Sequence, residues 1–313
     1  MSYLDYLRSF PTVRADNPYK EEIAGVIESR SVFDSHYISI YDKEPLYIER
    51  LLLTHVVDIY QLQIHFEYIS GNSGQTRAFA YKRINGEASG IFLDEVLDLS
   101  LIDVFLTVWA AAYRPDQINV CRTNFSYLIK DVLVNRERFS KKRTIIIQDV
   151  SMPDIAIEQA MDLYWAAWVF MVGHELFHLK NQEVLTTREE EFKADCFGFQ
   201  VVLRLIAEQK DGTIPKEIAS FYEEVYLAPC MLMEIFRIMD LYRNNPVEYG
   251  SDNNHPSPEE RFQAIIDLYD TEVPDDMDTE NGNAFLGTFL DATEQLTDKQ
   301  GEQFWVVSTG QKH

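Results

Sequence analysis

Two histidines four residues apart, at the end of a long apolar stretch, restrict this chain more than any other feature. The apolar residues Leu163–Gly173 run directly into His174-Glu175-Leu176-Phe177-His178. Residues four apart lie on one face of a helix, so His174 and His178 can bind one metal ion. Glu175 is then close enough to act on a water beside that ion. A helix with two structural histidines is the alternative interpretation of this motif.

A second acidic motif follows shortly after the histidines. Thr187 and Glu190 have the spacing of a capping box, which predicts that another helix begins there. Glu191 and Asp195 share a face of that helix. A catalytic zinc ion takes three protein ligands, so we predict Glu191 as the third ligand and Asp195 as the carboxylate that orients a ligand histidine. Glu189 and Glu190 are expected to be solvated, where they suit the helix dipole.

A third motif is His255-Pro256-Ser257-Pro258-Glu259-Glu260-Arg261. Ser257 has the character of a helix cap, and proline is favoured in the first helical position, so we expect a helix from Pro258 onward. His255 and Arg261 then lie on either side of that helix start. By itself the pattern is also consistent with His255 as an ordinary loop residue ahead of a cap.

Together the three motifs, roughly Val172 to Arg261, resemble the gluzincin metallopeptidases, especially the HtpX-like and CaaX-prenyl-protease family. The resemblance implies a zinc endopeptidase with one Zn2+ per chain. The ligands that it implies are His174, His178 and Glu191.

The same resemblance implies roles for the neighbouring residues. Glu175 would be the catalytic base, Asp195 would accept a hydrogen bond from a ligand histidine and so support it, and His255 and Arg261 would be catalytic residues close to the site. His255 is our first choice as a donor to the oxyanion, with Arg261 as the alternative. The link between the two helices is shorter than in that family and no membrane span is visible, so Lit-type or ImmA/IrrE-type peptidases are similar as well.

Composition restricts the partners. The chain has 28 basic and 51 acidic residues, a net charge of -23. This balance argues against nucleic-acid binding and against anionic membrane surfaces. The apolar runs Val104–Tyr113 and Leu163–Gly173 are too short to cross a bilayer, and the start has no signal-peptide pattern. Three cysteines (Cys121, Cys196 and Cys230) fit reduced thiols, so we expect a cytoplasmic protein with no nucleic-acid or membrane partner.

The expected fold class is α+β, with a small antiparallel sheet in the N-terminal half and a mainly helical, zincin-like catalytic half. Alternating residues in Leu62–Tyr68, a strand around Arg77–Arg83 and a third strand at Ala88–Leu93 predict a meander. An open sheet edge can pair with an extended peptide. We expect that edge at Ala88–Leu93, with Thr144–Gln148 as the second candidate, and an ordinary structural strand as the alternative for both.

We expect three regions: residues 1–150 with the sheet, residues 151–269 as the helical zinc-peptidase core, and residues 270–313 as an acidic linker and a segment that packs back. One compact unit is the alternative. Helices are expected over Leu46–Tyr60, Leu99–Tyr113, Asn124–Asn135, Ile155–Lys180, Glu191–Glu208 and part of Phe221–Asn244, where Pro229 should start or kink the helix.

The predicted function is hydrolysis of peptide bonds in a protein or peptide substrate by a metal-activated water, with Glu175 as the general base. The alternative is a zinc-containing regulatory or binding module, latent or inactive, in which a side chain such as His255 fills the fourth zinc position. The sequence leaves open the substrate, the oligomeric state and whether a regulatory partner binds.

Overall fold

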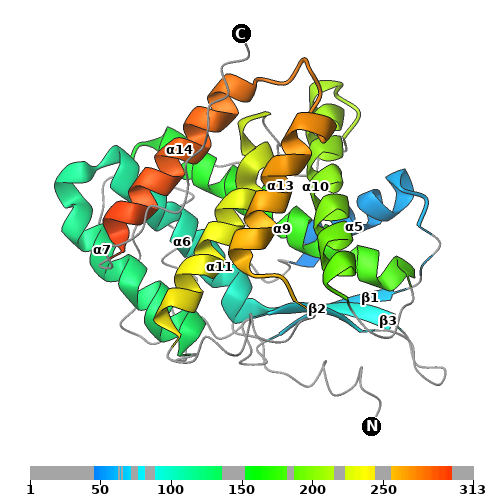
Figure 1. Cartoon of the computed structure of the whole chain (residues 1–313), viewed down its shortest axis with the longest axis horizontal. Helices are drawn as coiled ribbons and strands as arrows, with labels where there is room; N and C mark the ends of the chain where they lie inside the picture. Colours follow the sequence, from blue (N-terminus) through cyan, green and yellow to red (C-terminus); the bar gives the residue numbers. More distant parts are fainter. Residues whose placement is uncertain are drawn as a thin grey trace.

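The structure is a computed structural model, and it describes residues 46–62, 64, 66–71, 77–81, 89–135, 152–181, 187–214, 223–243 and 255–297. The second candidate for the edge strand, Thr144–Gln148, lies outside these residues. Most of the described chain is helical, and a small sheet lies in its N-terminal half, as the predicted α+β class requires. In Figure 1 the sheet lies at the lower edge of the molecule and the helices are stacked above it.

The sheet contains strands β1 (Phe66–Gly71), β2 (Ala78–Tyr81) and β3 (Ser89–Asp94), in the order β1-β3-β2. Strand β3 pairs in parallel with β1 and antiparallel with β2. The sheet is therefore mixed, and the predicted antiparallel meander is wrong. The predicted edge Ala88–Leu93 is also wrong, because β3 is the central strand.

The burial of β3 explains why it takes the central place. Ile91, Phe92 and Leu93 are 0% exposed, so the strand is covered on both faces and paired on both edges. A continuous apolar run is typical of such a strand. Tyr81 pairs with Gly90, where a Cβ atom would come within 2.1 Å of the Tyr81 hydroxyl. The glycine thus makes room for the tyrosine of β2.

Most of the predicted helices are present, with boundaries that move by a few residues, but the predicted helix Asn124–Asn135 is divided between an α-helix and a π-helix, and the last helix of the described chain was not predicted. In chain order they are α5 (Leu46–Ile59), α6 (Glu95–Tyr113), η1 (Pro115–Gln117), α7 (Ile118–Ser126), the π-helix η2 (Tyr127–Val134), α9 (Asp154–Asn181), α10 (Arg188–Lys210), η3 (Glu223–Leu227), α11 (Ala228–Tyr242), α13 (Pro258–Glu272) and α14 (Thr279–Leu296). Pro229 lies in the first turn of α11, where its missing N–H costs no hydrogen bond.

Helix α9 is the central helix of the core. Its aromatic residues Trp165, Trp168 and Phe170 are each 1% exposed, and it contacts α6, α10, α11 and strand β2. Because α9 is buried nearly all round, the histidine motif at its C-terminal end is held by a fixed element. The ribbon in Figure 1 has α9 behind α10, α11 and α13.

Helix α6 contains the run Val104–Tyr113 but begins earlier, at Glu95, because the Asp94 side chain accepts a hydrogen bond from the Val96 N–H. Among the described helices, it alone has the length and composition to cross a membrane, and 83% of its apolar window is buried inside the protein. This burial is that of a core helix.

The acidic segment from residue 270 is not a long linker. Helix α13 continues to Glu272, and Asp278 caps α14 by accepting a hydrogen bond from the Asn281 N–H. Helix α14 then packs against α6, where the rings of Phe285 and Trp109 lie 4.6 Å apart. The acidic residues of this segment are therefore divided between the end of α13, a short turn at Asp275 and Asp276, and the start of α14.

Candidate metal centre

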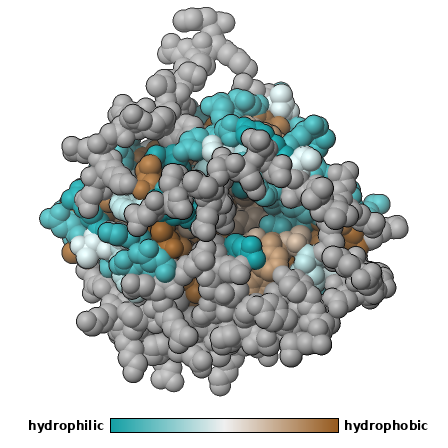
Figure 2. All heavy atoms as spheres, turned by 60° about the horizontal axis from the view of Figure 1, so that its bottom comes forward, coloured by the Kyte–Doolittle hydropathy of each residue, from teal (hydrophilic) through white to brown (hydrophobic). Residues whose placement is uncertain are grey.

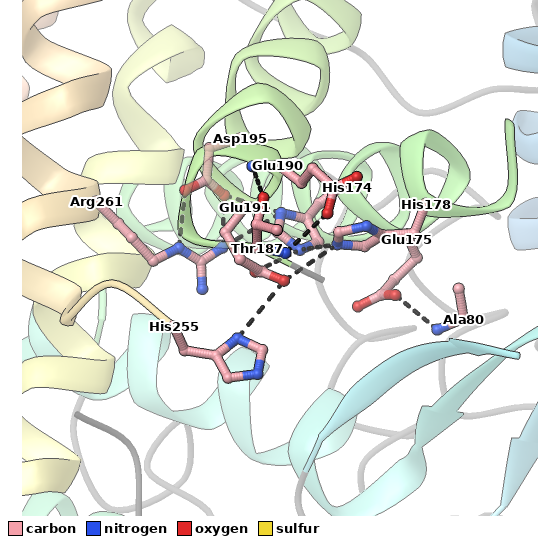
Figure 3. Close-up of polar contacts among 10 residues, drawn as sticks. All are labelled: Ala80, His174, Glu175, His178, Thr187, Glu190, Glu191, Asp195, His255 and Arg261. Atoms are coloured by element: carbon pink, nitrogen blue, oxygen red, sulfur yellow. Dashed lines mark hydrogen bonds and ion pairs between the residues drawn. The ribbon is translucent and has the colours of Figure 1, made fainter. Parts of the chain in front are cut away.

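Helices α9 and α10 bring three nitrogen and oxygen donors together. His174 Nε2 lies 3.1 Å from His178 Nε2 and 3.4 Å from Glu191 Oε2, and His178 Nε2 lies 3.4 Å from Glu191 Oε1. His174 is 7% exposed and Glu191 is 6% exposed. Figure 3 shows the three side chains converging from the two helices. Within the described chain, this is the one group of three donors that could hold a metal ion.

The distances between the donors fit zinc. Zinc bonds to histidine nitrogen and carboxylate oxygen are about 2.0–2.2 Å long, so ligand atoms at the corners of a tetrahedron lie about 3.3–3.6 Å from one another. The three measured distances, 3.1, 3.4 and 3.4 Å, are close to that range. Two imidazoles and one carboxylate are also ligands that zinc prefers, and they leave a fourth position free for water.

Asp195 and Arg261 hold His174 in place. His174 Nδ1 donates a hydrogen bond to Asp195 Oδ1 at 2.9 Å, which leaves the lone pair on Nε2 directed at the other donors. The Arg261 guanidinium donates to both oxygens of Asp195, with Nε at 2.8 Å from Oδ2. Asp195 is 0% exposed, so Arg261 supplies the charge that a buried carboxylate needs.

The pKa values of these groups reflect the same contacts. Burial lowers the pKa of His174, but the hydrogen bonds to Asp195 and Glu191 have the larger opposite effect. Together these contacts raise the pKa above its usual value, to about 9. Burial raises the pKa of Glu191, and the hydrogen bonds from the two histidines outweigh it, so that the pKa is far below its usual value. In Asp195, burial is likewise outweighed by the charge of Arg261, which lowers the pKa. Glu191 and Asp195 are therefore held in the anionic form, in which carboxylate oxygens can bind a cation or support its ligands.

Glu175 lies on the side of α9 that faces the sheet. It is 9% exposed, and its Oε2 accepts a hydrogen bond from the backbone N–H of Ala80 at 2.6 Å. Figure 3 shows this bond crossing from α9 to β2. The carboxylate therefore lies between the two histidines and a strand.

Among the strands that the structure describes, β2 lies at the edge of the sheet next to the candidate metal centre. The Asp94 N–H of β3 donates a hydrogen bond to the Arg77 carbonyl. In an antiparallel pair every second residue bonds to the partner strand, so the backbone groups of Arg77, Phe79 and Tyr81 face β3. The N–H and carbonyl groups of Ala78 and Ala80 then face away from β3. A strand around Arg77–Arg83 was predicted, but the spacing of residues along the chain did not indicate that this strand, and not Ala88–Leu93, lies at the edge.

His255 lies on the solvent-exposed side of the candidate metal centre. Its Nδ1 is 3.5 Å from Glu191 Oε1, and 47% of its side chain is exposed. The structure thus brings His255 to the metal centre, but it also leaves the ring free to reach solvent. Figure 2 views the molecule with the bottom of Figure 1 turned forward, and hydrophilic and hydrophobic described residues lie side by side on this face.

Two capping boxes fix the helices that carry Glu191 and Arg261. Thr187 and Glu190 exchange hydrogen bonds at the start of α10, and Ser257 and Glu260 do so at the start of α13. Glu191 and Arg261 are the residues directly after the two capping glutamates. The two helix starts are also joined, because Arg188 forms an ion pair with Glu260.

Comparison with known proteins agrees with a peptidase. The sequence model of the family Peptidase U49 matches residues 119–279, just over half of the chain. The matched segment contains the residues of the metal centre, whereas strands β1, β2 and β3 precede it. No curated protein and no solved structure shows significant similarity to the chain.

Proposed function

This chain belongs to the peptidase U49 family, and from that premise we propose that it is a zinc-dependent endopeptidase of the gluzincin type. A peptidase acts on protein or peptide substrates. The observation that carries the proposal is the triangle of His174, His178 and Glu191, whose donor atoms have the spacing of zinc ligands. A carboxylate, Glu175, lies directly beside that triangle, where hydrolysis needs a base.

The ligands in this proposal are the two histidines of α9 and Glu191 of α10. Zinc, when bound, supplies a Lewis acid that acidifies water and polarises a carbonyl group. Asp195 keeps the Nδ1 proton of His174 in place, so that Nε2 remains a ligand. Arg261 acts through Asp195, because its Nε and Nη2 atoms are engaged with that carboxylate.

Glu175 moves the proton. Its carboxylate takes a proton from the attacking water and later delivers it to the leaving amine, which is the ordinary task of a general base and acid. The geometry supports this role because Glu175 is one residue after a ligand and points along α9 toward β2. Among the carboxylates of the centre, Glu191 and Asp195 are already engaged with histidines and with Arg261.

Strand β2 holds the substrate in this proposal. An extended peptide that pairs with the side of β2 opposite β3 would lie beside Glu175, and at Ala80 it would replace the hydrogen bond from the N–H to Glu175. Backbone pairing makes few demands on the side chains of the substrate. Selectivity would then come from the pockets on either side.

His255 is our choice for the donor to the oxyanion. It is half exposed and 3.5 Å from a ligand oxygen, so its ring can reach a substrate carbonyl beside the centre. Arg261 is less suited, since two of its nitrogens already donate to Asp195.

The test is the metal content of the purified protein by mass spectrometry. We expect about one zinc per chain in the wild type and a large loss in Glu191→Ala. Glu189→Ala is the matched control, because Glu189 is a neighbouring glutamate whose side chain is 78% exposed and paired with Lys193. Wild-type protein that binds no zinc after reconstitution would refute the proposal.

A second candidate function rests on His255. If its ring turned toward the ion instead of the substrate, the chain would be a latent enzyme or a zinc-containing binding module, with the fourth position filled. The 3.5 Å distance to Glu191 is compatible with that small movement. His255→Ala separates the two functions. If the wild type is a latent enzyme, the variant gains peptidase activity, and if the wild type is active, the variant loses activity.

The cytoplasmic location is also part of the proposal. The three cysteines are free, and Cys121 and Cys230 are buried. Unpaired, buried cysteines suit a reducing compartment.

A further inference from the structure

Helices α9 and α10 touch backbone to backbone at two glycines. A Cβ atom on Gly198 would lie 2.7 Å from the carbonyl oxygen of Phe170 and 3.2 Å from the backbone nitrogen of His174. A Cβ atom on Gly173 would lie 3.0 Å from the Cα of Gly198. There is no room for a side chain where the two helices cross.

This crossing lies within the metal centre. Gly173 directly precedes the ligand His174, and Gly198 follows Asp195 by one helical turn. Glu191, Asp195 and Gly198 have the spacing i, i+4, i+7, so they lie on the one face of α10 that is turned to α9. The distance between the helix backbones therefore decides the distance between the donors that they carry.

We infer that Gly198 and Gly173 are positioning residues of the metal centre, which hold α9 and α10 at the separation that three ligands require. The inference rests on the proposed function, since it concerns the same ligands. Glycine is unfavourable inside a helix, and both residues lie well inside theirs. The close backbone contact gives a reason for them at these two positions.

A new side chain at Gly198 displaces the helices by more than zinc ligands tolerate. The atom nearest to a new Cβ on Gly198 is a backbone oxygen, which cannot rotate away, so the helices themselves must separate by several tenths of an ångström. Zinc–ligand distances are tolerated within only about 0.2 Å. A single methyl group at Gly198 therefore moves Glu191 relative to the histidines by more than the site allows.

The experiment compares glycine-to-alanine variants of the full chain. Gly198→Ala is the test, and Gly287→Ala in α14 is the control for helix substitution, because nothing lies within 4 Å of its Cβ position. Gly282→Ala is the control for destabilisation, since its Cβ would meet the Tyr226 ring at 2.2 Å. Zinc affinity is measured by competition with a chromogenic chelator, and ligand geometry by the visible spectrum of the cobalt form, both well below each unfolding temperature.

We expect Gly198→Ala to lose zinc affinity about tenfold or more, the size of effect seen when ligand-orienting groups are changed, and to alter the cobalt spectrum. Gly287→Ala should match the wild type. Gly282→Ala should unfold at a lower temperature and keep the zinc affinity.

Wild-type affinity and spectrum in Gly198→Ala would overturn the inference, and so would an equal loss of affinity in Gly282→Ala. If Gly198→Ala does not fold, Gly173→Ala replaces it. Its contacts are milder, at 3.0 Å to Gly198 and 3.4 Å to Val201, so a smaller loss of affinity supports the inference and an unchanged affinity overturns it. The two failures are distinguishable. A wild type that does not bind zinc refutes the proposed function, whereas the results for the glycine variants bear only on the role of Gly198 and Gly173.

Discussion

The backbone N–H of Ala80 donates a hydrogen bond to Glu175 Oε2 at 2.6 Å. This bond joins two parts of the chain with different relations to the family: Glu175 lies in the segment that matches Peptidase U49, and Ala80 precedes it. The general base that we propose is therefore oriented in part by a strand outside the matched segment. A substrate backbone on the same edge would compete with Glu175 for that N–H.

The first prediction concerns this edge. Ala80→Pro removes the N–H and puts a ring carbon against Glu175, and proline is tolerated where an edge N–H points away from the ladder. We expect kcat/KM to fall at least about tenfold, more than the loss of one hydrogen bond, while zinc content stays unchanged. Ala80→Ser keeps the N–H and serves as the control. Full activity in Ala80→Pro would exclude β2 from catalysis.

The second prediction separates the base from the ligands. Glu175→Gln should keep its zinc and lose about 10²- to 10⁴-fold in kcat, because the amide cannot take a proton. His178→Ala should lose both zinc and activity. Zinc content and peptide hydrolysis are measured on the same preparations. Zinc loss in Glu175→Gln, or activity that survives in it, would contradict the assignment.

The third prediction concerns Arg261. Arg261→Lys keeps the charge but not the two-pronged contact with Asp195, so the orientation of His174 is weakened. Zinc affinity should fall about 10- to 100-fold, as is usual when such supporting contacts are lost. Arg188→Lys is the control, because it changes an exposed arginine that pairs with Glu260. Equal zinc affinity in both variants would mean that Arg261 has no role in holding His174.

The fourth prediction concerns His255. His255→Ala should keep its zinc and lose about 10²- to 10³-fold in kcat, with KM little changed, if the ring donates to the oxyanion. The variant leaves the protein fold intact because the side chain is 47% exposed. Higher activity in the variant would instead indicate a latent enzyme in which His255 blocks the centre.

The fifth prediction concerns removal of the metal. Zinc binds the folded chain and should stabilise it by about 2.7 kcal/mol when the free zinc concentration is a hundred times the Kd. A chelator should therefore lower Tm in the wild type, measured by calorimetry, and added zinc should restore it. In Glu191→Ala neither treatment should move Tm by a comparable amount.

Local features of the centre were predictable from sequence. The capping boxes at Thr187 and Ser257 depend on residues three apart, and the helices begin where these residues predict. The shared face of His174 and His178 follows from helical spacing. Burial of Glu191, and exposure of Glu189, also agree with the prediction that only one of the neighbouring glutamates faces inward.

Relations between distant elements were not predictable. The order of the strands depends on which strand is buried on both faces, and turn signals between Phe66 and Asp94 do not contain that information. Arg261 was expected near the site, but its contact with Asp195 requires α10 and α13 to lie side by side, which spacing along the chain does not reveal. The assignment of the metal and the catalytic roles stays a prediction for the experiments above.

The capping box at Thr187 has a consequence for how related chains can differ. A cap decides where a helix begins. The direction in which Glu191 points therefore depends on its spacing from the cap Thr187, and not on its spacing from His178. Residues can then be gained or lost between α9 and Thr187 without rotating Glu191, provided that the chain still reaches. The sequence distance between the histidine and glutamate motifs is thus free to drift over evolution. A search for remote relatives should permit gaps there and require Thr-x-x-Glu-Glu after them.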